Sequence, residues 1–120
     1  MIDQVHITTQ RHGDVFVMRI EHPSIFADEV CVELRDLLVK FIKQTKAPRI
    51  VIDMSRIQEL GSRFLGALIM LRKTADSCGG KLLLSQMSDQ VAMSFRVAGL
   101  NKTIRTVSSL DNAISEMDKD

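Results

Sequence analysis

The feature that most constrains the fold is an unbroken apolar run, Ile50-Val51-Ile52, followed after a short polar segment by a stripe of apolar residues. Such a run is too short for a helix and too apolar for a strand with one face in solvent. We therefore predict a strand over residues 49–54 that is covered on both faces and lies at the centre of a sheet. From Ser62 onward, helical spacing predicts a helix. Its apolar stripe consists of Phe64, Leu65, Leu68, Leu71 and Ala75.

The flanking segments alternate between strand and helix patterns. Residues 5–9 and 15–20 are β-rich runs separated by turn formers, which predicts an antiparallel hairpin. A first helix is expected to end before Pro48, and glycine follows the second predicted helix where a left-handed cap is needed. The core stripe expected for the first helix is Val30, Leu34, Leu37, Leu38 and Phe41.

From residue 81 onward, the sequence predicts a strand over residues 81–85 and a third helix that Ser88 caps and that ends at Gly99. A short strand over residues 104–107 and a last helix capped by Ser108 or Ser109 follow. The order implies an α/β fold. We expect a single mixed β-sheet, with an opening antiparallel hairpin and then parallel strands, and about four helices packed against it.

Composition limits the class of protein. The chain has 120 residues, a net charge of +1 and no apolar tract long enough to span a membrane, so we expect one domain over residues 1–120 with no membrane partner. Acidic and basic residues are mixed along the chain, which argues against direct binding to nucleic acid. Two isolated cysteines and the absence of a signal peptide fit a cytoplasmic protein.

The residues that usually carry enzyme chemistry are scattered. The three histidines have no metal-ligand spacing, and Cys31 and Cys78 are expected to be structural thiols. Asp53 ends the central strand with no second carboxylate near it in sequence, so a turn-bracing role is favoured. We therefore expect a non-enzymatic protein that needs no metal or cofactor.

Ser62 is the remaining candidate for function. It follows a glycine at the start of the second predicted helix, where its hydroxyl can cap an orphan backbone N–H group of the first turn. The same position suits a phosphate acceptor, because the helix dipole tolerates an added charge of about −1.5 to −2. Spacing alone leaves both roles open.

Three stretches carry the landmarks of a known family. Residues 50–55 form a predicted strand that ends in aspartate, an apolar residue and serine. Residues 61–68 correspond to a loop and helix that usually read D-S-[ST]-G-L-G-x-L. Residues 79–84 and 97–100 contain two later glycine motifs of the family. On these motifs the segment 50–114 resembles the STAS domain family, shared by anti-sigma factor antagonists and the cytoplasmic tails of sulfate transporters. The rest of the chain matches it more weakly.

The resemblance implies a partner-switching protein in signal transduction and transcription regulation. In the antagonist branch, Ser62 corresponds to a serine that an anti-sigma factor kinase phosphorylates and a PP2C-like phosphatase resets. Gly61, Arg63 and Phe64 replace the usual aspartate, hydroxyl residue and glycine, so they imply a different partner surface around Ser62. The start of the first helix, residues 26–29, lies near this loop in the family, and Asp28 is the acidic residue assigned to that surface. A monomer or weak dimer is expected.

Two other functions compete with this hypothesis. One is a constitutive scaffold or assembly subunit, in which Ser62 only caps its helix and Phe64 joins an oligomer contact. A variant of the switch hypothesis is also open, in which the partner switch controls a process other than a sigma factor. The other is a small-ligand or nucleotide-binding domain at the end of the central strand.

Overall fold

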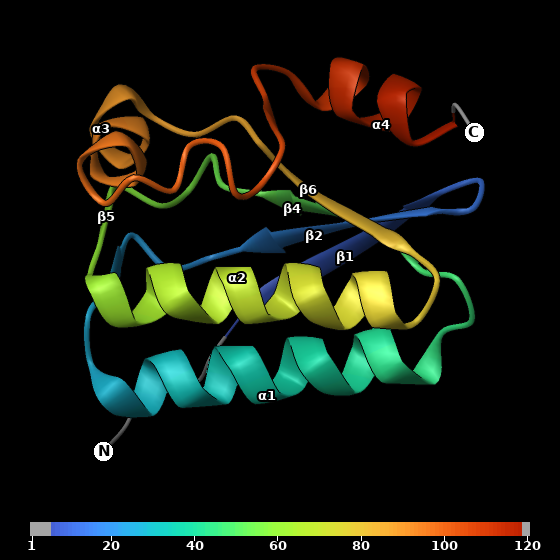
Figure 1. Ribbon diagram of the computed structural model, residues 1–120, viewed down its shortest axis with the longest axis horizontal. Helices are drawn as coiled ribbons and strands as arrows, with labels where there is room; N and C mark the ends of the chain where they lie inside the picture. The colour runs from blue at the N-terminus through green and yellow to red at the C-terminus, as the bar shows by residue number, and fades with distance from the viewer. Residues whose placement is uncertain (1–5, 119–120) are drawn as a thin grey trace.

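The computed structural model in Figure 1 describes residues 6–118 and contains seven strands and four helices. The strands are β1 (Ile7–His12), β2 (Val15–Ile20), β3 (Ser24–Ile25), β4 (Arg49–Asp53), β5 (Glu59–Leu60), β6 (Lys81–Ser85) and β7 (Thr106–Val107). The helices are α1 (Asp28–Gln44), α2 (Ser62–Ser77), α3 (Asp89–Val97) and α4 (Leu110–Asp118). The predicted first strand began at Val5, which lies outside the described residues.

The main sheet has five strands in the order β1-β2-β4-β6-β7. β1 pairs antiparallel with β2, and the pairs β2–β4, β4–β6 and β6–β7 are parallel. This confirms the predicted mixed sheet with an opening hairpin. The sequence did not predict β3 and β5, two-residue strands that pair parallel as a separate small sheet, because so short a strand has no detectable alternation.

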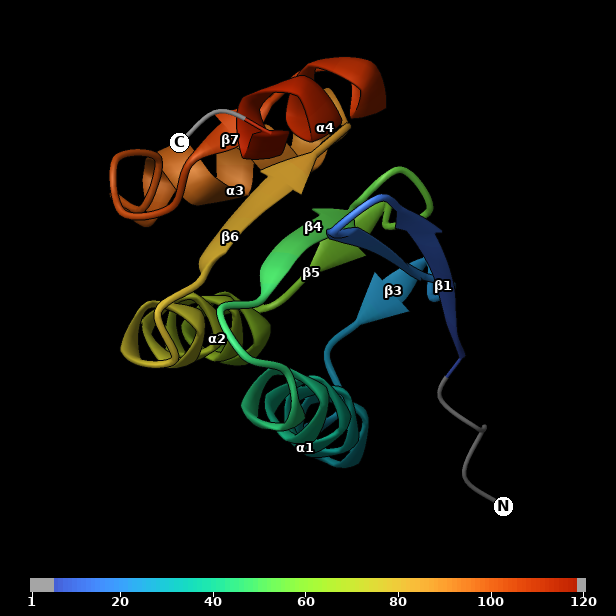
Figure 2. The same ribbon diagram turned by 90° about the vertical axis from the view of Figure 1, so that its right-hand side faces the viewer.

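β4 is the central strand, as its apolar run predicts. Ile50 and Ile52 are fully buried in the larger core between the sheet and helices α1 and α2. Val51 faces the other way, into a smaller core shared with α4. Figure 2 shows these two layers on opposite sides of the sheet. The burial of both faces explains why no polar residue interrupts this run.

Helices α1 and α2 lie side by side on one face of the sheet, with their N-termini at the same end (Figure 1). The predicted α2 stripe is confirmed, since every member of it is buried. For α1 the prediction of Leu37 as a core residue is wrong: its side chain is 47% exposed. The helix is rotated so that Leu37 lies beside the buried face, on the side exposed to solvent. The residues buried on that face are Cys31, Leu34, Leu38 and Ile42.

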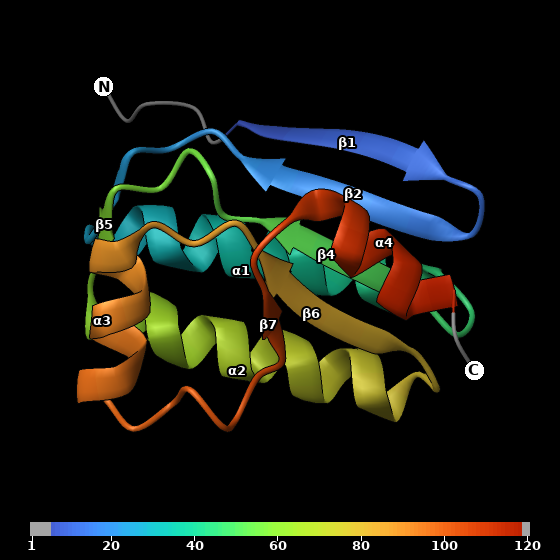
Figure 3. The same ribbon diagram turned by 90° about the horizontal axis from the view of Figure 1, so that it is seen from above.

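Helices α3 and α4 begin at serine caps. The Ser88 hydroxyl accepts a hydrogen bond from the Val91 N–H group at 3.2 Å, as predicted. Of the two serines proposed for α4, Ser109 is the cap, because its hydroxyl accepts from the Asn112 N–H group at 3.1 Å. Figure 3 shows α4 lying across the strands that it covers, and α3 at the end of the sheet near the start of α2. In the described part of the chain, no helix has the length and apolarity that crossing a membrane requires.

The C-terminus of α2 stops as predicted, at a left-handed glycine. Gly79 has φ +75°, and the Gly80 N–H group reaches back to the Ala75 carbonyl oxygen at 2.9 Å. Gly80 also lies against Pro48, so that a Cβ at position 80 would overlap the Pro48 carbonyl oxygen. Close backbone approach therefore requires glycine at this position.

Two matched substitutions test this packing. Gly80→Ala is expected to lower the free energy of unfolding by about 1–3 kcal/mol, because the backbone at Pro48 must shift to admit the methyl group. Gly66→Ala, in the middle of α2 with nothing within 4 Å of an added Cβ, is expected to raise it by up to about 1 kcal/mol. Urea denaturation of both variants measures the difference. Equal effects of the two substitutions would contradict the packing described.

Candidate functional site

Ser62 is exposed and is the first helical residue of α2. The predicted cap role is wrong: the N-cap is Gly61, and no side-chain hydrogen bond caps this helix. The Gly61 carbonyl oxygen accepts from the N–H groups of Phe64 and Leu65 at 3.1 and 3.2 Å. A capping hydroxyl has to come from the residue before the first turn, and Ser62 already lies inside that turn. Its hydroxyl is therefore not engaged in capping the helix.

Gly61 lies against the ring of Phe26. A Cβ at position 61 would be 3.0 Å from the Phe26 Cδ1 atom, so a larger residue there would require the ring to move. The Gly61 N–H group donates to the Ile25 carbonyl oxygen at 2.9 Å, which extends the pairing of β3 with β5. Phe26 is 53% exposed. An exposed aromatic ring therefore lies beside Ser62 where the family motif carries an aspartate.

An ion pair joins the starts of the two helices. Arg63 Nε lies 2.8 Å from Asp28 Oδ1, with the two side chains 63% and 70% exposed. The structure thus brings together four of the five residues assigned to the partner surface: Asp28, Gly61, Ser62 and Arg63. Because both side chains are well solvated, the pair adds little to the stability of the fold.

Phe64 does not belong to this surface. Its side chain is fully buried, so the prediction that it contacts a partner or forms an oligomer contact is corrected. It lies on the α2 stripe that faces the sheet, and the helical spacing that predicted this stripe also removes Phe64 from solvent. Phe26 is the phenylalanine that this surface exposes. The sequence pointed to the segment 26–29, but it could not show which of its side chains lies beside Ser62.

Ser62 also borders a groove between the start of α2 and the exposed side of α3, here called the α2–α3 groove. Its volume is about 680 Å³. Met93 and Val97 of α3 line it and are 52% and 81% exposed. Asp89 is the one charged residue among the described residues that line it. The full lining is Leu60, Ser62, Leu65, Asp89, Gln90, Met93, Ser94, Val97 and Ala98.

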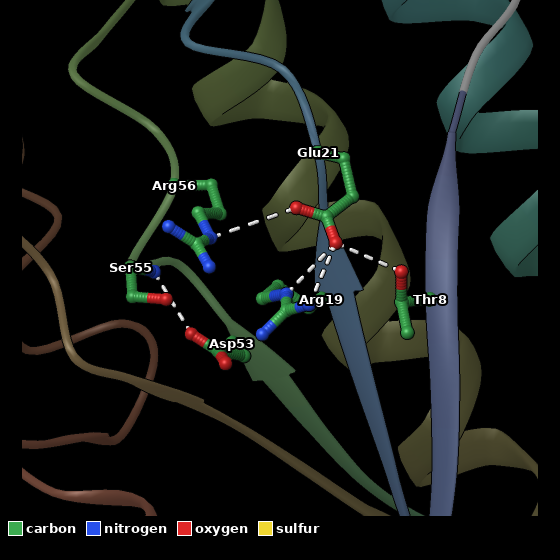
Figure 4. Close-up of polar contacts among 6 residues, drawn as sticks. All are labelled: Thr8, Arg19, Glu21, Asp53, Ser55 and Arg56. Carbon is green, nitrogen blue, oxygen red and sulfur yellow. Dashed lines mark hydrogen bonds and ion pairs between the residues drawn. The ribbon is translucent and has the colours of Figure 1, made fainter.

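A cluster of polar side chains centred on Glu21, here called the Glu21 cluster, lies at the carboxyl ends of β2 and β4 (Figure 4). Glu21 accepts hydrogen bonds from Thr8 Oγ1 at 2.8 Å and from Arg19 Nε at 2.9 Å, and Arg56 Nε lies 3.7 Å from its other oxygen. The hydrogen bond from Thr8 lowers the pKa of Glu21 the most. The hydrogen bond and charge of Arg19 and the charge of Arg56 lower it further. These contacts tie β1, β2 and the loop after β4 together.

Asp53 braces that loop, as predicted. Its Oδ1 atom accepts from the Ser55 N–H group at 2.9 Å, and its side chain is buried. Within residues 6–118, no group of three or more histidine, cysteine or acidic side chains is placed to hold a metal ion. Cys31 and Cys78 are free thiols, and burial raises the pKa of Cys31, which disfavours the reactive thiolate.

The Glu21 cluster gives a pH-dependent contribution to stability. Because the pKa of Glu21 in the folded state lies below the ordinary 4.5, the ionised carboxylate stabilises the fold above that pH. The contribution is lost as the pH falls through the lowered pKa. We expect Glu21→Gln to unfold at lower urea concentration than wild type at neutral pH, and the difference to shrink as the pH drops below 4.5. Glu33→Gln, on the exposed side of α1, corrects for the change in net charge. A difference that grows in acid would contradict this account.

Comparison with known proteins identifies the fold. The STAS domain family model matches residues 6–113. A putative anti-sigma factor antagonist from Thermotoga maritima aligns with a TM-score of 0.82 at 16% identity, over 94% of this chain and 95% of that one. An anti-sigma factor antagonist from Mycobacterium paratuberculosis gives a TM-score of 0.78 at 21% identity, over 95% and 94%. A murine Slc26a9 anion transporter gives 0.78 at 15% identity, over 92% of this chain and 19% of the transporter. Identities this low establish a shared fold.

Proposed function

The chain belongs to the STAS domain family, and from that membership we propose that it is a partner-switching protein of the anti-sigma factor antagonist type, controlled by phosphorylation of Ser62. Its partners in this proposal are an anti-sigma factor with serine kinase activity and a PP2C-like phosphatase. It works by binding and release, without catalysing a reaction itself. The observation that carries the proposal is the exposed Ser62 at a helix start, on the border of an apolar groove.

Several features of Ser62 favour a modified serine. The side chain is exposed and caps no backbone group, so its phosphorylation would break no hydrogen bond that caps the helix. The position at the start of α2 places an added phosphate near the positive end of the helix dipole. The modified chain should therefore keep its fold, and only its surface should change.

The surroundings of Ser62 explain how a phosphate would release a partner. Met93 and Val97 on one side offer apolar contact area, and Phe26 packs on Gly61 on the other. A partner covering this surface would have to desolvate a phosphate of charge about −1.5 to −2 at its centre. Asp89 lines the same groove and adds like-charge repulsion. A loss of about 1.4 kcal/mol in binding free energy already weakens binding tenfold.

The residues around Ser62 also bear on which partner binds. Glycine at position 61 stands where the family motif has an aspartate before the serine, so the carboxylate is absent. The Phe26 ring lies against this position. The partner of this chain should therefore present an apolar surface there, where the partners of Asp-Ser antagonists meet a charge. An output other than a sigma factor remains compatible with this difference.

Phosphorylation of Ser62 is tested with the serine kinase encoded nearest to this chain. We expect kinase and ATP to add one phosphate to the wild-type chain, mapped to Ser62 by tandem mass spectrometry, and none to Ser62→Ala. Ser77, exposed at the other end of α2, serves as the control position: Ser77→Ala should be modified like wild type. Absence of phosphate on Ser62, or equal modification of Ser62→Ala, would refute the proposed site.

The α2–α3 groove is tested by partner affinity. Met93→Ser removes an exposed apolar contact at little cost to the fold, and we expect it to weaken binding of the same kinase by about tenfold or more. Leu37→Ser, on the exposed side of α1 outside this groove, is the matched control and should bind this kinase like wild type. Unchanged affinity of Met93→Ser would remove this groove from the interface.

The exposed apolar side chains of α3 also suit the alternative of a constitutive assembly subunit. Val97, at 81% exposure, is the most exposed of the large apolar residues described. Light scattering distinguishes the two functions, because a large assembly that persists in Ser62→Glu favours the assembly subunit, whereas a monomeric chain favours the switch.

A further inference from the structure

A second groove runs along the outer seam between α1 and α2, and the proposed switch does not use it. It consists of two adjoining hollows of about 180 and 480 Å³ that share Gly66 and Met70. One hollow is bounded by Cys31, Val32, Arg35, Arg63 and Ala67, and the other by Lys43, Ile69, Lys73, Thr74 and Ser77. We call the whole the α1–α2 groove, and we propose that it binds an amphipathic helix of a partner protein whose apolar stripe is flanked by acidic residues.

Gly66 is the first argument for an external occupant. It lies inside α2, where glycine lowers helix stability relative to alanine. A Cβ at this position would meet no atom within 4 Å, so no close contact within the chain requires glycine here. The open space lies at the junction of the two hollows. A residue without a side chain at that point lets another backbone approach α2 closely.

Apolar side chains in the groove give the occupant something to bury. Met70 is 48% exposed and Val32 is 38% exposed, and both line the hollow at the N-terminal end of the seam. From Arg63 to Ser77 the α2 helix rises by about 21 Å, which matches a partner helix of about four turns. The groove therefore has the length that a docked helix requires, and its N-terminal hollow offers exposed apolar side chains that such a helix can bury.

Charge selects the kind of helix. Arg35 and Arg63 lie at one end of the groove and Lys43 and Lys73 at the other, and none of its described lining residues is acidic. Asp28 and Asp36 pair with the two arginines without lining the groove. A partner helix with glutamate or aspartate beside its apolar stripe would meet cations at both ends, whereas a basic helix would be repelled.

This inference does not depend on phosphorylation of Ser62, and its test needs no kinase. The probe is a stapled, fluorescently labelled helix of about 16 residues, with alanine and leucine on one face and glutamate on both flanks. A matched peptide carries lysine at every glutamate position. Anisotropy titration against the full chain measures both affinities, and amide chemical-shift changes locate the bound peptide.

We expect the glutamate peptide to bind wild type at least about tenfold more tightly than the lysine peptide. Gly66→Leu, whose Cβ meets no atom within 4 Å, should weaken that binding at least about tenfold, with Gly66→Ala intermediate. Lys43→Glu combined with Lys73→Glu should reverse the preference between the two peptides. Lys102→Glu, in the exposed segment after α3, should bind like wild type.

Three results of the peptide experiments would overturn the proposal. They are equal or undetectable binding of the two peptides, binding that Gly66→Leu leaves unchanged, and chemical-shift changes confined to elements other than α1 and α2. Sedimentation of the chain alone tests whether a second copy of the chain occupies this groove. Self-association that Gly66→Leu abolishes would show that it does, and would also refute the proposal.

Discussion

The burial of β4 on both faces is the constraint on which the rest of the structure depends. With Ile50 and Ile52 under α1 and α2 and Val51 under α4, the strand fixes where both helical layers lie. Removing such side chains from water is the largest favourable term available to a chain of this size. The parallel neighbours β2 and β6 then direct their carboxyl ends to the same edge as β4, and the helices that follow begin at that end.

The candidate site depends on a smaller interaction, the backbone pairing of β3 with β5. Ile25 lies opposite Leu60, and the Gly61 N–H group continues the ladder to the Ile25 carbonyl oxygen. These bonds hold the segment before α1 against the segment before α2. Phe26 thereby comes to rest on Gly61, and Asp28 comes within hydrogen-bond distance of Arg63. The surroundings of Ser62 are thus assembled from two segments far apart in the sequence.

The two grooves differ in a way that fits separate roles. The α2–α3 groove is apolar, contains one carboxylate among its described lining residues and borders Ser62, so a phosphate there changes its character. The α1–α2 groove is lined by cations and apolar side chains, and it meets the Ser62 surface only at Arg63. As proposed, the α2–α3 groove responds to modification and the α1–α2 groove binds a partner constitutively, so the two interactions need not exclude one another.

The sequence by itself determined the main sheet, the four helices and the buried stripe of α2, because the spacing of apolar residues and the glycines that end helices are local signals. It also placed Phe64 on a buried stripe, which conflicted with the partner role assigned to it by motif position, and the structure decided in favour of burial. Tertiary structure alone decided the rotation of α1 that exposes Leu37, the pairing of β3 with β5, and the identity of Gly61 as the cap of α2. Each of these depends on contacts between segments distant in sequence, and spacing along one segment carries no information about what packs against it.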